Sequence, residues 1–491
     1  MPYVEGEERK QTILFPETIE DYIGENNLVR VIDEFVNQLD MVEGGFRFAE
    51  PPLTGRPPYN PKDMLKLYLY GYLNGIRSSR KLEHETKRNL EVLWLLKKLS
   101  PDFKTIADFR KHHKKPLKNI FRRFNQLCDE WDLFGKELIA IDGSKFKASN
   151  SKKNNVTRKK IARNLNYIEE KINQYFKELD EHDEAEEPDR TPDTDEVNKR
   201  LQQLRERKTK YLEFEKELDE SGQTEISTTD PDARLMVTSN NSVEVGYNVQ
   251  TTVDAKHKLV LDFEVTNQPN DMGQLDDMAL RAKTLLKQGK EEKLTVLADK
   301  GYYNADDLKQ CVEAGVIPYV SKQTYSNGTG DKDFYSDKFI YNRDKDVYIC
   351  PMGQELGFAK VRKTKAKGVV GYNYQNYQAC DGCSARTRCT RSKKGRSIFR
   401  HVDQDFLDGI DQQTFENIKT YRLRQIIVEH PFGTIKRNWG ASYLLTRGIK
   451  AATAEMSLTF LAYNFKRVAN ILGVKEMIRR LRTGTGEVMA V

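Results

Sequence analysis

The sequence of 491 residues predicts an α/β fold, in which a mixed β-sheet flanked by helices follows an all-α N-terminal region. Three observations predict it. Apolar residues recur at helical spacing through residues 1–130, and short apolar runs then alternate with helical stretches up to residue 470. Two segments of different composition, 161–218 and 321–410, interrupt that alternation. A chain of this length is expected to divide into several domains.

The composition describes a soluble globular protein, with 38% hydrophobic and 32% charged residues and a formal net charge of +7. No apolar run approaches the roughly 20 residues that span a bilayer, so we expect no membrane partner. The N-terminus lacks the basic and apolar regions of a signal peptide, and six cysteines do not make a secreted disulfide scaffold. We therefore expect a cytoplasmic protein with reduced thiols.

The N-terminal region, residues 1–130, is predicted to be a bundle of short helices. Residues 61–73 carry an apolar face at a 3.6-residue period, and Pro61 suits the first helical position. The chain restarts at Ser78 or Ser79, a further helix is expected through residues 90–99, and Thr105 is expected to cap a short basic helix.

Basic residues near these helix starts, among them Arg77 and Arg80, favour a helix-turn-helix-like DNA reader. The alternative is an all-α packing or dimerisation domain with a solvated basic face.

The core, residues 131–470, begins with a strand at 137–142 that ends in Asp142 followed by glycine. A hairpin (243–253 and 259–265), a helix (274–286), a strand (294–298) ending in Asp299, a helix (304–315) and a strand (316–320) follow. Three antiparallel strands followed by crossover strands is the layout of a ribonuclease H-like fold. Residues 414–438 and 448–472 are helical, with Pro431 expected to kink or restart the first, and residues 471–491 form a tail.

The two insertions have different patterns. Residues 161–218 carry apolar residues at steps of three and four around an acidic, proline-bearing centre at 181–194, which predicts an antiparallel helical hairpin with a disordered tip. We expect it to act in spacing or pairing. Residues 321–410 hold all but two of the cysteines.

A basic run begins three residues after Asp142 and contains Lys145, Lys147, Lys152 and Lys153. Such a run is usually a solvated segment. Its position beside a candidate catalytic acid favours a second interpretation, in which these lysines bind the phosphates of DNA.

Three carboxylates occupy prominent positions: Asp142 and Asp299 at predicted strand ends, and Glu429 on a helix. Phosphodiester chemistry uses such a cluster to hold two divalent ions, and carboxylate oxygens without His or Cys suit Mg²⁺ or Mn²⁺. The alternative is that the two aspartates cap loops and Glu429 faces solvent.

The segments around these acids resemble a family. Ile-Ala-Ile-Asp142-Gly-Ser-Lys, Val-Leu-Ala-Asp299-Lys-Gly-Tyr-Tyr and the stretch from Tyr421 to Lys436 are together similar to the DDE transposases of bacterial insertion sequences. Residues 55–61 and 75–80 resemble the InsH-type helical domain that many of them carry, and 461–467 resembles their end.

The resemblance implies a metal-dependent transposase that binds the inverted repeats of a mobile element, hydrolyses phosphodiester bonds at its ends and joins the 3′-OH ends to target DNA. The family's Tyr-Arg-Glu-Lys signature falls on Tyr421, Arg424, Glu429 and Lys436. The spacing from Arg424 to Glu429 is one residue longer than the commonest form. We also expect the active complex to be a homodimer and to be associated with the bacterial nucleoid.

Lys436 lies seven residues beyond Glu429, which places both on one helix face and suits Lys436 to a phosphate beside the metal site. Its alternative is a surface lysine.

The cysteines form a second group. Cys350, Cys380, Cys383 and Cys389 include one C-x₂-C pair and supply four thiolates for a structural Zn²⁺; otherwise they are reduced surface thiols. Cys128 and Cys311 are expected to pack inside helices.

Two rival functions remain open from the sequence. A nuclease of the same fold would cleave DNA without joining it, and a non-catalytic DNA-binding protein would be a domesticated element or a repressor.

Overall fold

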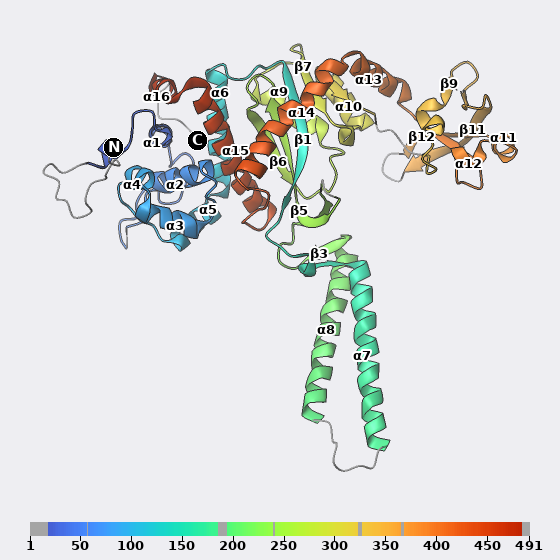
Figure 1. The fold of residues 1–491 in the computed structure, drawn as a ribbon, viewed down its shortest axis with the longest axis horizontal. Helices are drawn as coiled ribbons and strands as arrows, with labels where there is room; N and C mark the ends of the chain where they lie inside the picture. Colours follow the sequence, from blue (N-terminus) through green and yellow to red (C-terminus); the bar gives the residue numbers. More distant parts are fainter. Residues whose placement is uncertain are drawn as a thin grey trace, which may run out of the picture.

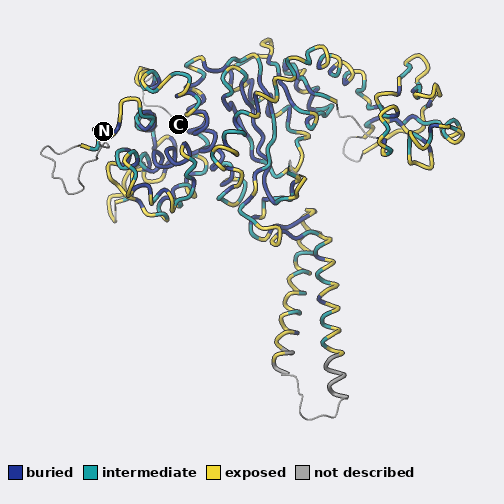
Figure 2. The backbone as a smooth tube through the Cα atoms, in the orientation of Figure 1, coloured by how far each residue is buried: buried dark blue, intermediate teal, exposed yellow. Residues whose placement is uncertain are grey.

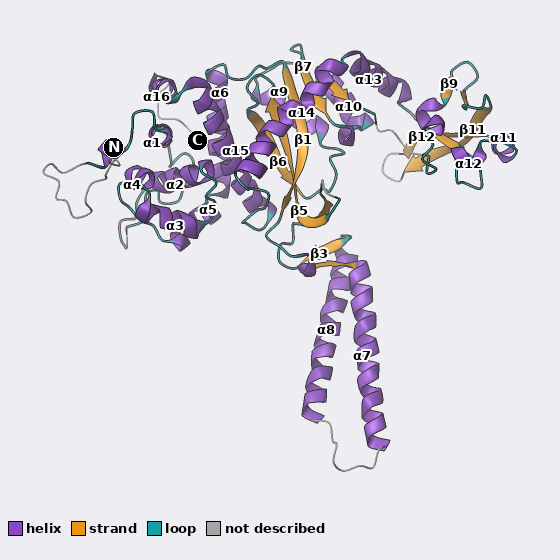
Figure 3. Ribbon diagram, in the orientation of Figure 1, coloured by secondary structure: helices purple, strands orange, loops and turns teal. Residues whose placement is uncertain are grey.

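The computed structural model describes residues 18–55, 57–184, 194–238, 241–322, 327–364 and 368–483. A helical region lies at one end, a mixed sheet in the middle and a small β-module at the other end, while a long helical hairpin projects away from the sheet (Figure 1). Figure 3 shows that strands are concentrated in the central sheet and in the small module. No helix in these ranges is long and apolar enough to cross a membrane.

The central sheet contains β1 (Leu138–Lys147), β5 (Val243–Asp254), β6 (Val260–Thr266), β7 (Leu294–Ala298) and β8 (Val316–Val320) in the order β6-β5-β1-β7-β8, and β4 (Arg234–Val237) pairs with the start of β5. β1 runs antiparallel to β5 and parallel to β7, which is parallel to β8. α9 (Leu275–Leu285) and α10 (Ala305–Glu313) connect the later strands. The predicted order of strands and helices is confirmed.

β1 differs from the prediction, because it continues past Asp142 to Lys147. Its parallel pairing with β7 stops at Ile141, which is opposite Ala298, but its antiparallel pairing with β5 continues as far as Gly246. Because β5 extends further than β7, the backbone of β1 stays hydrogen-bonded beyond Asp142. Asp142 therefore lies within a strand, whereas Asp299 directly follows the end of β7 as predicted.

The N-terminal helices are α1 (Leu28–Asn37), α2 (Pro61–Leu73), α3 (Ser79–Arg88), α4 (Leu90–Leu95), α5 (Phe103–His112) and α6 (Lys114–Glu130). The predicted helix 61–73 is confirmed with the same bounds. α4 stops earlier than predicted, where Lys97 and Lys98 take positive φ angles. The cap of α5 is Asp102 rather than Thr105, since the Asp102 carboxylate accepts the N–H groups of Lys104 and Thr105.

The C-terminal part contains α13 (Gln404–Glu416), α14 (Ile418–Gly433), the π-helical turn η6 (Thr434–Asn438), α15 (Ile449–Leu472) and α16 (Val474–Thr483). The expected restart at Pro431 is wrong, because α14 continues through it, and the expected kink stays a prediction. An irregularity comes three residues later, as the π turn η6.

α15 contacts α2, α6 and β6, so one hydrophobic core joins the N-terminal helices, the central sheet and the C-terminal helices, while the two insertions have small cores of their own. The domain boundary near residue 130 stays a prediction, but packing across it is continuous.

The first insertion forms α7 (Arg158–Glu184) and α8 (Thr194–Ser221) on a base of β2 (Asn155–Thr157) paired with β3 (Glu225–Ser227). This confirms the helical hairpin, and most of its predicted disordered tip lies outside the described residues. Figure 2 shows that exposed positions predominate along both helices.

The second insertion is a five-stranded module of β9 (Ile340–Asn342), β10 (Val347–Ile349), β11 (Glu355–Thr364), β12 (Gly368–Gln375) and β13 (Ser397–His401), with α11 (Tyr377–Asp381) and α12 (Arg386–Cys389). The remaining short elements are the 3₁₀ helices η1 (Ile19–Tyr22), η2 (Lys152–Asn154), η3 (Lys300–Tyr302), η4 (Lys332–Phe334) and η5 (Ser336–Lys338).

Candidate active site

The sheet brings two of the predicted acids together. Because Ile141 on β1 lies opposite Ala298 on the parallel strand β7, the next residues, Asp142 and Asp299, follow on neighbouring strands. Asp142 Oδ1 accepts the N–H of Gly143 at 2.9 Å, and Asp299 Oδ1 accepts the N–H of Gly301 at 2.6 Å. Each carboxylate is thus held by the backbone N–H of a glycine that closely follows it in the chain.

The electrostatics of Asp142 reflect this crowding. Burial is the main cause that raises the pKa of Asp142, to about 7; the charges of Asp299 and Asp271 contribute to the rise, and the guanidinium of Arg424 opposes it. Burial, followed by the charges of Asp271, Asp142 and Asp299, also raises the pKa of the Tyr302 hydroxyl. Tyr302 and the three aspartates therefore share one partly enclosed, acidic site.

Asp271 is the member that the sequence did not reveal. It lies in the loop between β6 and α9, and its Oδ1 accepts hydrogen bonds from Asn248 Nδ2 and Gln250 Nε2, both at 2.7 Å. Lys145 Nζ lies 3.3 Å from the same oxygen. In the sequence, Gln268-Pro-Asn-Asp-Met-Gly273 looks like an ordinary polar turn, and only the structure places its acid over β1.

Three cationic side chains of the predicted set enter the same site. Lys436 Nζ donates to Ser144 Oγ at 2.6 Å and to the carbonyl of Lys145 at 2.7 Å, and it lies 4.4 Å from the centre of the Phe146 ring. Burial lowers the pKa of Lys436 to about 8, with Lys145 lowering it and Asp142 raising it. Arg424 on α14 is near enough to lower the pKa of Asp142.

Glu429 is positioned differently. It lies on α14, which contacts β1, β5 and β7, but its side chain is exposed and accepts a hydrogen bond from Gln425 Nε2 at 2.8 Å. Lys436 lies within the π turn and is bonded to β1, so the two residues predicted to share a helix face have different surroundings. Within the described ranges, no three His, Cys, Asp or Glu side chains are arranged to hold a metal ion.

The predicted basic run is largely engaged within the protein. Lys147 and Lys152 Nζ lie 3.6 and 3.4 Å from the two carboxylate oxygens of Glu244, and Lys153 is exposed near them. Tyr421 is half-buried on α14.

Of the two N-terminal arginines, Arg80 is exposed, with its guanidinium 5.1 Å from the centre of the Phe103 ring. Arg77 is only 8% exposed and donates to the Tyr443 carbonyl at 2.7 Å and to Glu455 Oε1 at 3.3 Å. The prediction that Arg77 contacts DNA is therefore replaced by a structural role, because its guanidinium is buried in an internal ion pair.

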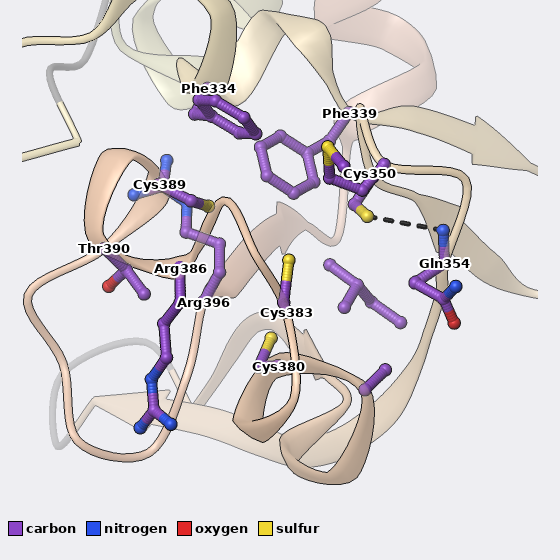
Figure 4. Close-up of a pocket in the computed structure, with 13 residues that line it drawn as sticks. Phe334, Phe339, Cys350, Gln354, Cys380, Cys383, Arg386, Cys389, Thr390 and Arg396 are labelled. Atoms are coloured by element: carbon purple, nitrogen blue, oxygen red, sulfur yellow. Dashed lines mark hydrogen bonds between the residues drawn. The ribbon is translucent and has the colours of Figure 1, made fainter.

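The four predicted zinc ligands lie around one pocket of the β-module (Figure 4). Cys350 Sγ accepts the N–H of Gln354 at 3.3 Å, which is one way a sulfur is held in a metal-binding turn. Burial is the main cause that raises the pKa of Cys389, to about 11; the other three cysteines contribute to the rise, and Arg396 opposes it. Cys128 and Cys311 are buried in helices α6 and α10, which confirms their packing role.

The donor chemistry between β1 and β7 fits a hard divalent cation, since it offers carboxylate oxygens without thiol or imidazole. One further observation supports the fit. Asn248 is fully buried, and its Oδ1 has no hydrogen-bond partner among the described residues although it lies beside Gly143 and the Asp271 carboxylate. An unmatched buried oxygen in an acidic site is suited to a cation or to its bound water.

Comparisons with known proteins agree with the resemblance. A family model described as "Transposase domain (DUF772)" matches residues 17–112, and one described as "Transposase DDE domain" matches residues 349–469. No curated protein matches the chain. Among solved structures, the chain is similar to a cryo-EM structure of the piggyBac transposase synaptic complex with hairpin DNA, at 10% identity and a TM-score of 0.25, over 94% of this chain and 85% of that one.

Proposed function

Because this chain belongs to the DDE transposases of insertion sequences, we propose that it cleaves DNA at the ends of a mobile element and joins the freed 3′-OH ends to target DNA. The observation that carries the proposal is the meeting of Asp142 and Asp299 at adjacent strands, with Lys436 and Arg424 beside them. The strand order β6-β5-β1-β7-β8 supports a ribonuclease H-like core for this reaction.

Asp142, Asp299 and Glu429 would hold Mg²⁺ or Mn²⁺. The ions would supply a polarised phosphate and an activated attacking oxygen when bound. Lys436 and Arg424 would place the DNA backbone against the acids, since phosphate contacts fix the position of a duplex without reading its sequence. Arg80 and the other exposed basic side chains of the N-terminal helices would take part in recognising the inverted repeats, and two copies would act together on two ends.

The proposal is tested by cleavage and joining of a labelled DNA that carries the element's own ends, in Mg²⁺, with Asp299→Asn beside the wild type. We expect nicked and strand-transferred products from the wild type and neither from the variant. Nicks without joined product would establish a nuclease instead. Specific binding of the ends without cleavage by either protein, with Mn²⁺ also tried, would leave a non-catalytic DNA-binding protein.

We further propose that Cys350, Cys380, Cys383 and Cys389 hold a structural Zn²⁺. Their shared pocket supports this, as does the small size of the module's own hydrophobic core, which consists of five buried residues: Phe339, Tyr348, Leu356, Tyr374 and Ile398. A core this small is expected to need a metal or another cross-link for stability.

The zinc proposal is tested by elemental analysis of the purified chain, in which we expect about one Zn²⁺ per protein and its loss in Cys383→Ser. Cys311→Ser, which changes a buried helical cysteine outside the module, is the matched control and should keep the metal. A wild type without zinc, or a Cys383→Ser variant with a full complement, would refute the site.

A further inference from the structure

Asp271 is held in place by donors from two strands. Lys145 comes from β1, and Asn248 and Gln250 come from β5, where Gly143 pairs with Gln250 and Lys145 pairs with Asn248. All three donate to Oδ1 of Asp271. That oxygen is saturated, which leaves Oδ2 as the oxygen available to a further partner.

Two glycines show how closely the carboxylate approaches the backbone. A Cβ at Gly143 would overlap Asp271 Oδ1 and lie 2.5 Å from Gln250 Nε2. A Cβ at Gly301 would lie 2.8 Å from Asp299 Oδ1 and 3.6 Å from Asp271 Oδ2. Asp271 thus sits over the residue that follows Asp142, and its Oδ2 shares the space above Gly301 with Asp299.

The side chains that donate hydrogen bonds to Asp271 are themselves held in place. The buried Tyr302 hydroxyl donates to Gln250 Oε1, and this orients the Gln250 amide so that its Nε2 donates to Asp271. The neighbouring Asn248 donates through Nδ2, and its buried Oδ1, beside the same carboxylate, has no partner in the part of the chain that the structure describes. A carboxylate held by three donors on two strands, one of them oriented by a tyrosine in a 3₁₀ turn, is positioned more firmly than loop acids usually are.

We propose that Asp271 supplies, through Oδ2, a fourth carboxylate oxygen to the divalent cation of this site, and that Lys145 serves as its counter-charge. The proposal rests on the proposed function and deepens it. Within the described residues no three of these acids are arranged to hold a metal ion, and negative carboxylates repel one another, so a bound cation would be needed to draw them together. Lys145, predicted to contact DNA, has an internal partner in this arrangement.

The test is Mn²⁺ binding by the full chain without DNA, followed by electron paramagnetic resonance of the free ion. Asp271→Asn keeps an Oδ1 that accepts the same three donors but replaces Oδ2 by an NH₂ group. We expect binding to weaken by at least roughly 10- to 100-fold, the range seen when groups supporting a metal are removed. Asp277→Asn, the same change at an exposed carboxylate paired with Arg281 on α9, should bind Mn²⁺ as the wild type does.

A purely structural Asp271 would give a different pattern. Asp271→Asn leaves the Lys145 ammonium unpaired, so the double variant Asp271→Asn/Lys145→Met removes both charges and relieves any folding defect, which the melting temperature in EDTA would report. Weak Mn²⁺ binding by a folded double variant supports the ligand role. Wild-type binding by either variant overturns it.

Asp142→Asn and Asp299→Asn separate this inference from the proposed function. If they lose Mn²⁺ while Asp271→Asn keeps it, the site stands without Asp271. If they bind like the wild type, the proposed metal site itself fails and the role of Asp271 fails with it.

Discussion

Asp142 keeps its proton to a higher pH than an exposed aspartate because its surroundings are both buried and negative. Asp299 and Asp271 face it from the neighbouring strand and from the β6–α9 loop, and Arg424 on α14 compensates only in part. A site of this kind stores unfavourable electrostatic energy in the free protein, and a bound cation would relieve it.

The pH dependence of stability follows from this shift. The folded protein holds the Asp142 proton up to a pKa of about 7, whereas the unfolded chain releases it near the usual 3.8, so the unfolded state binds fewer protons between those values. The contribution of Asp142 to the free energy of unfolding therefore falls as the pH rises through this window.

Asp142→Asn should remove that contribution. Its stability relative to the wild type, from urea unfolding in EDTA, should be higher at pH 8 than at pH 5 by on the order of a few kcal/mol. Asp277→Asn serves as the exposed control and should show no comparable change between the two pH values. An equal difference between Asp142→Asn and the wild type at both pH values would contradict the assignment.

At the scale of elements, α15 is the helix on which the other layers pack. It contacts α2 and α6 on one side and β6 on another, and Asn464 on it joins Asn125 of α6 to the Val260 carbonyl of β6. Glu455, fully buried on the same helix, accepts the N–H groups of Leu445 and Thr446 and pairs with Arg77. One carboxylate therefore fixes the N-terminal helices and the segment after the π turn to the same helix.

Glu455→Gln should destabilise the protein by about 3–5 kcal/mol, because it leaves the buried Arg77 charge uncompensated and turns an amide donor toward backbone N–H groups. The urea midpoint of the wild type and the variant measures it. Glu220→Gln removes the exposed partner of Lys216 on α8 and should cost less than about 1 kcal/mol. Equal effects of the two substitutions would show that the Arg77–Glu455 pair does not support the shared core.

At the scale of the whole molecule, the helical hairpin is separable from the sheet. α7 and α8 contact each other and the short strands β2 and β3 at their base, with a small core of their own formed by Val156, Ile161, Leu218 and Ile226. Thr157 pairs with Glu225 in register, so the two ends of the hairpin already lie at the distance of a strand pair.

Replacing residues 158–224 by Asn-Gly should give a folded protein, because a two-residue turn can join antiparallel partners such as Thr157 and Glu225. The helical signal in circular dichroism should fall while the unfolding free energy of the remaining core changes by no more than about 1 kcal/mol, since sites far apart act independently. If the hairpin pairs two copies, nicking of a single DNA end should persist and joining should decline. A variant that fails to fold would show that the hairpin supports the sheet.

The sequence could predict what local patterns determine. The 3.6-residue period gave α2 its bounds, and short apolar runs gave β7 and β8 with Asp299 at the end of β7. It could not predict features that depend on partners distant in the chain. The extension of β1 past Asp142 follows from the length of β5, and the burial of Arg77 follows from Glu455, which lies 378 residues away. The place of Asp271 in the site could not be predicted for the same reason, because its partners are on β1 and β5.

The continuous core also determines when the chain can fold during synthesis. The N-terminal helices must wait for α15, which emerges from the ribosome more than 300 residues after α6. At translation rates of about 5–20 residues per second, that interval lasts a few tens of seconds. During it, the apolar faces of α2 and α6 that α15 will cover remain open, so the nascent chain is a natural client for chaperones, and a truncated translation product would lack the helix that completes its N-terminal core.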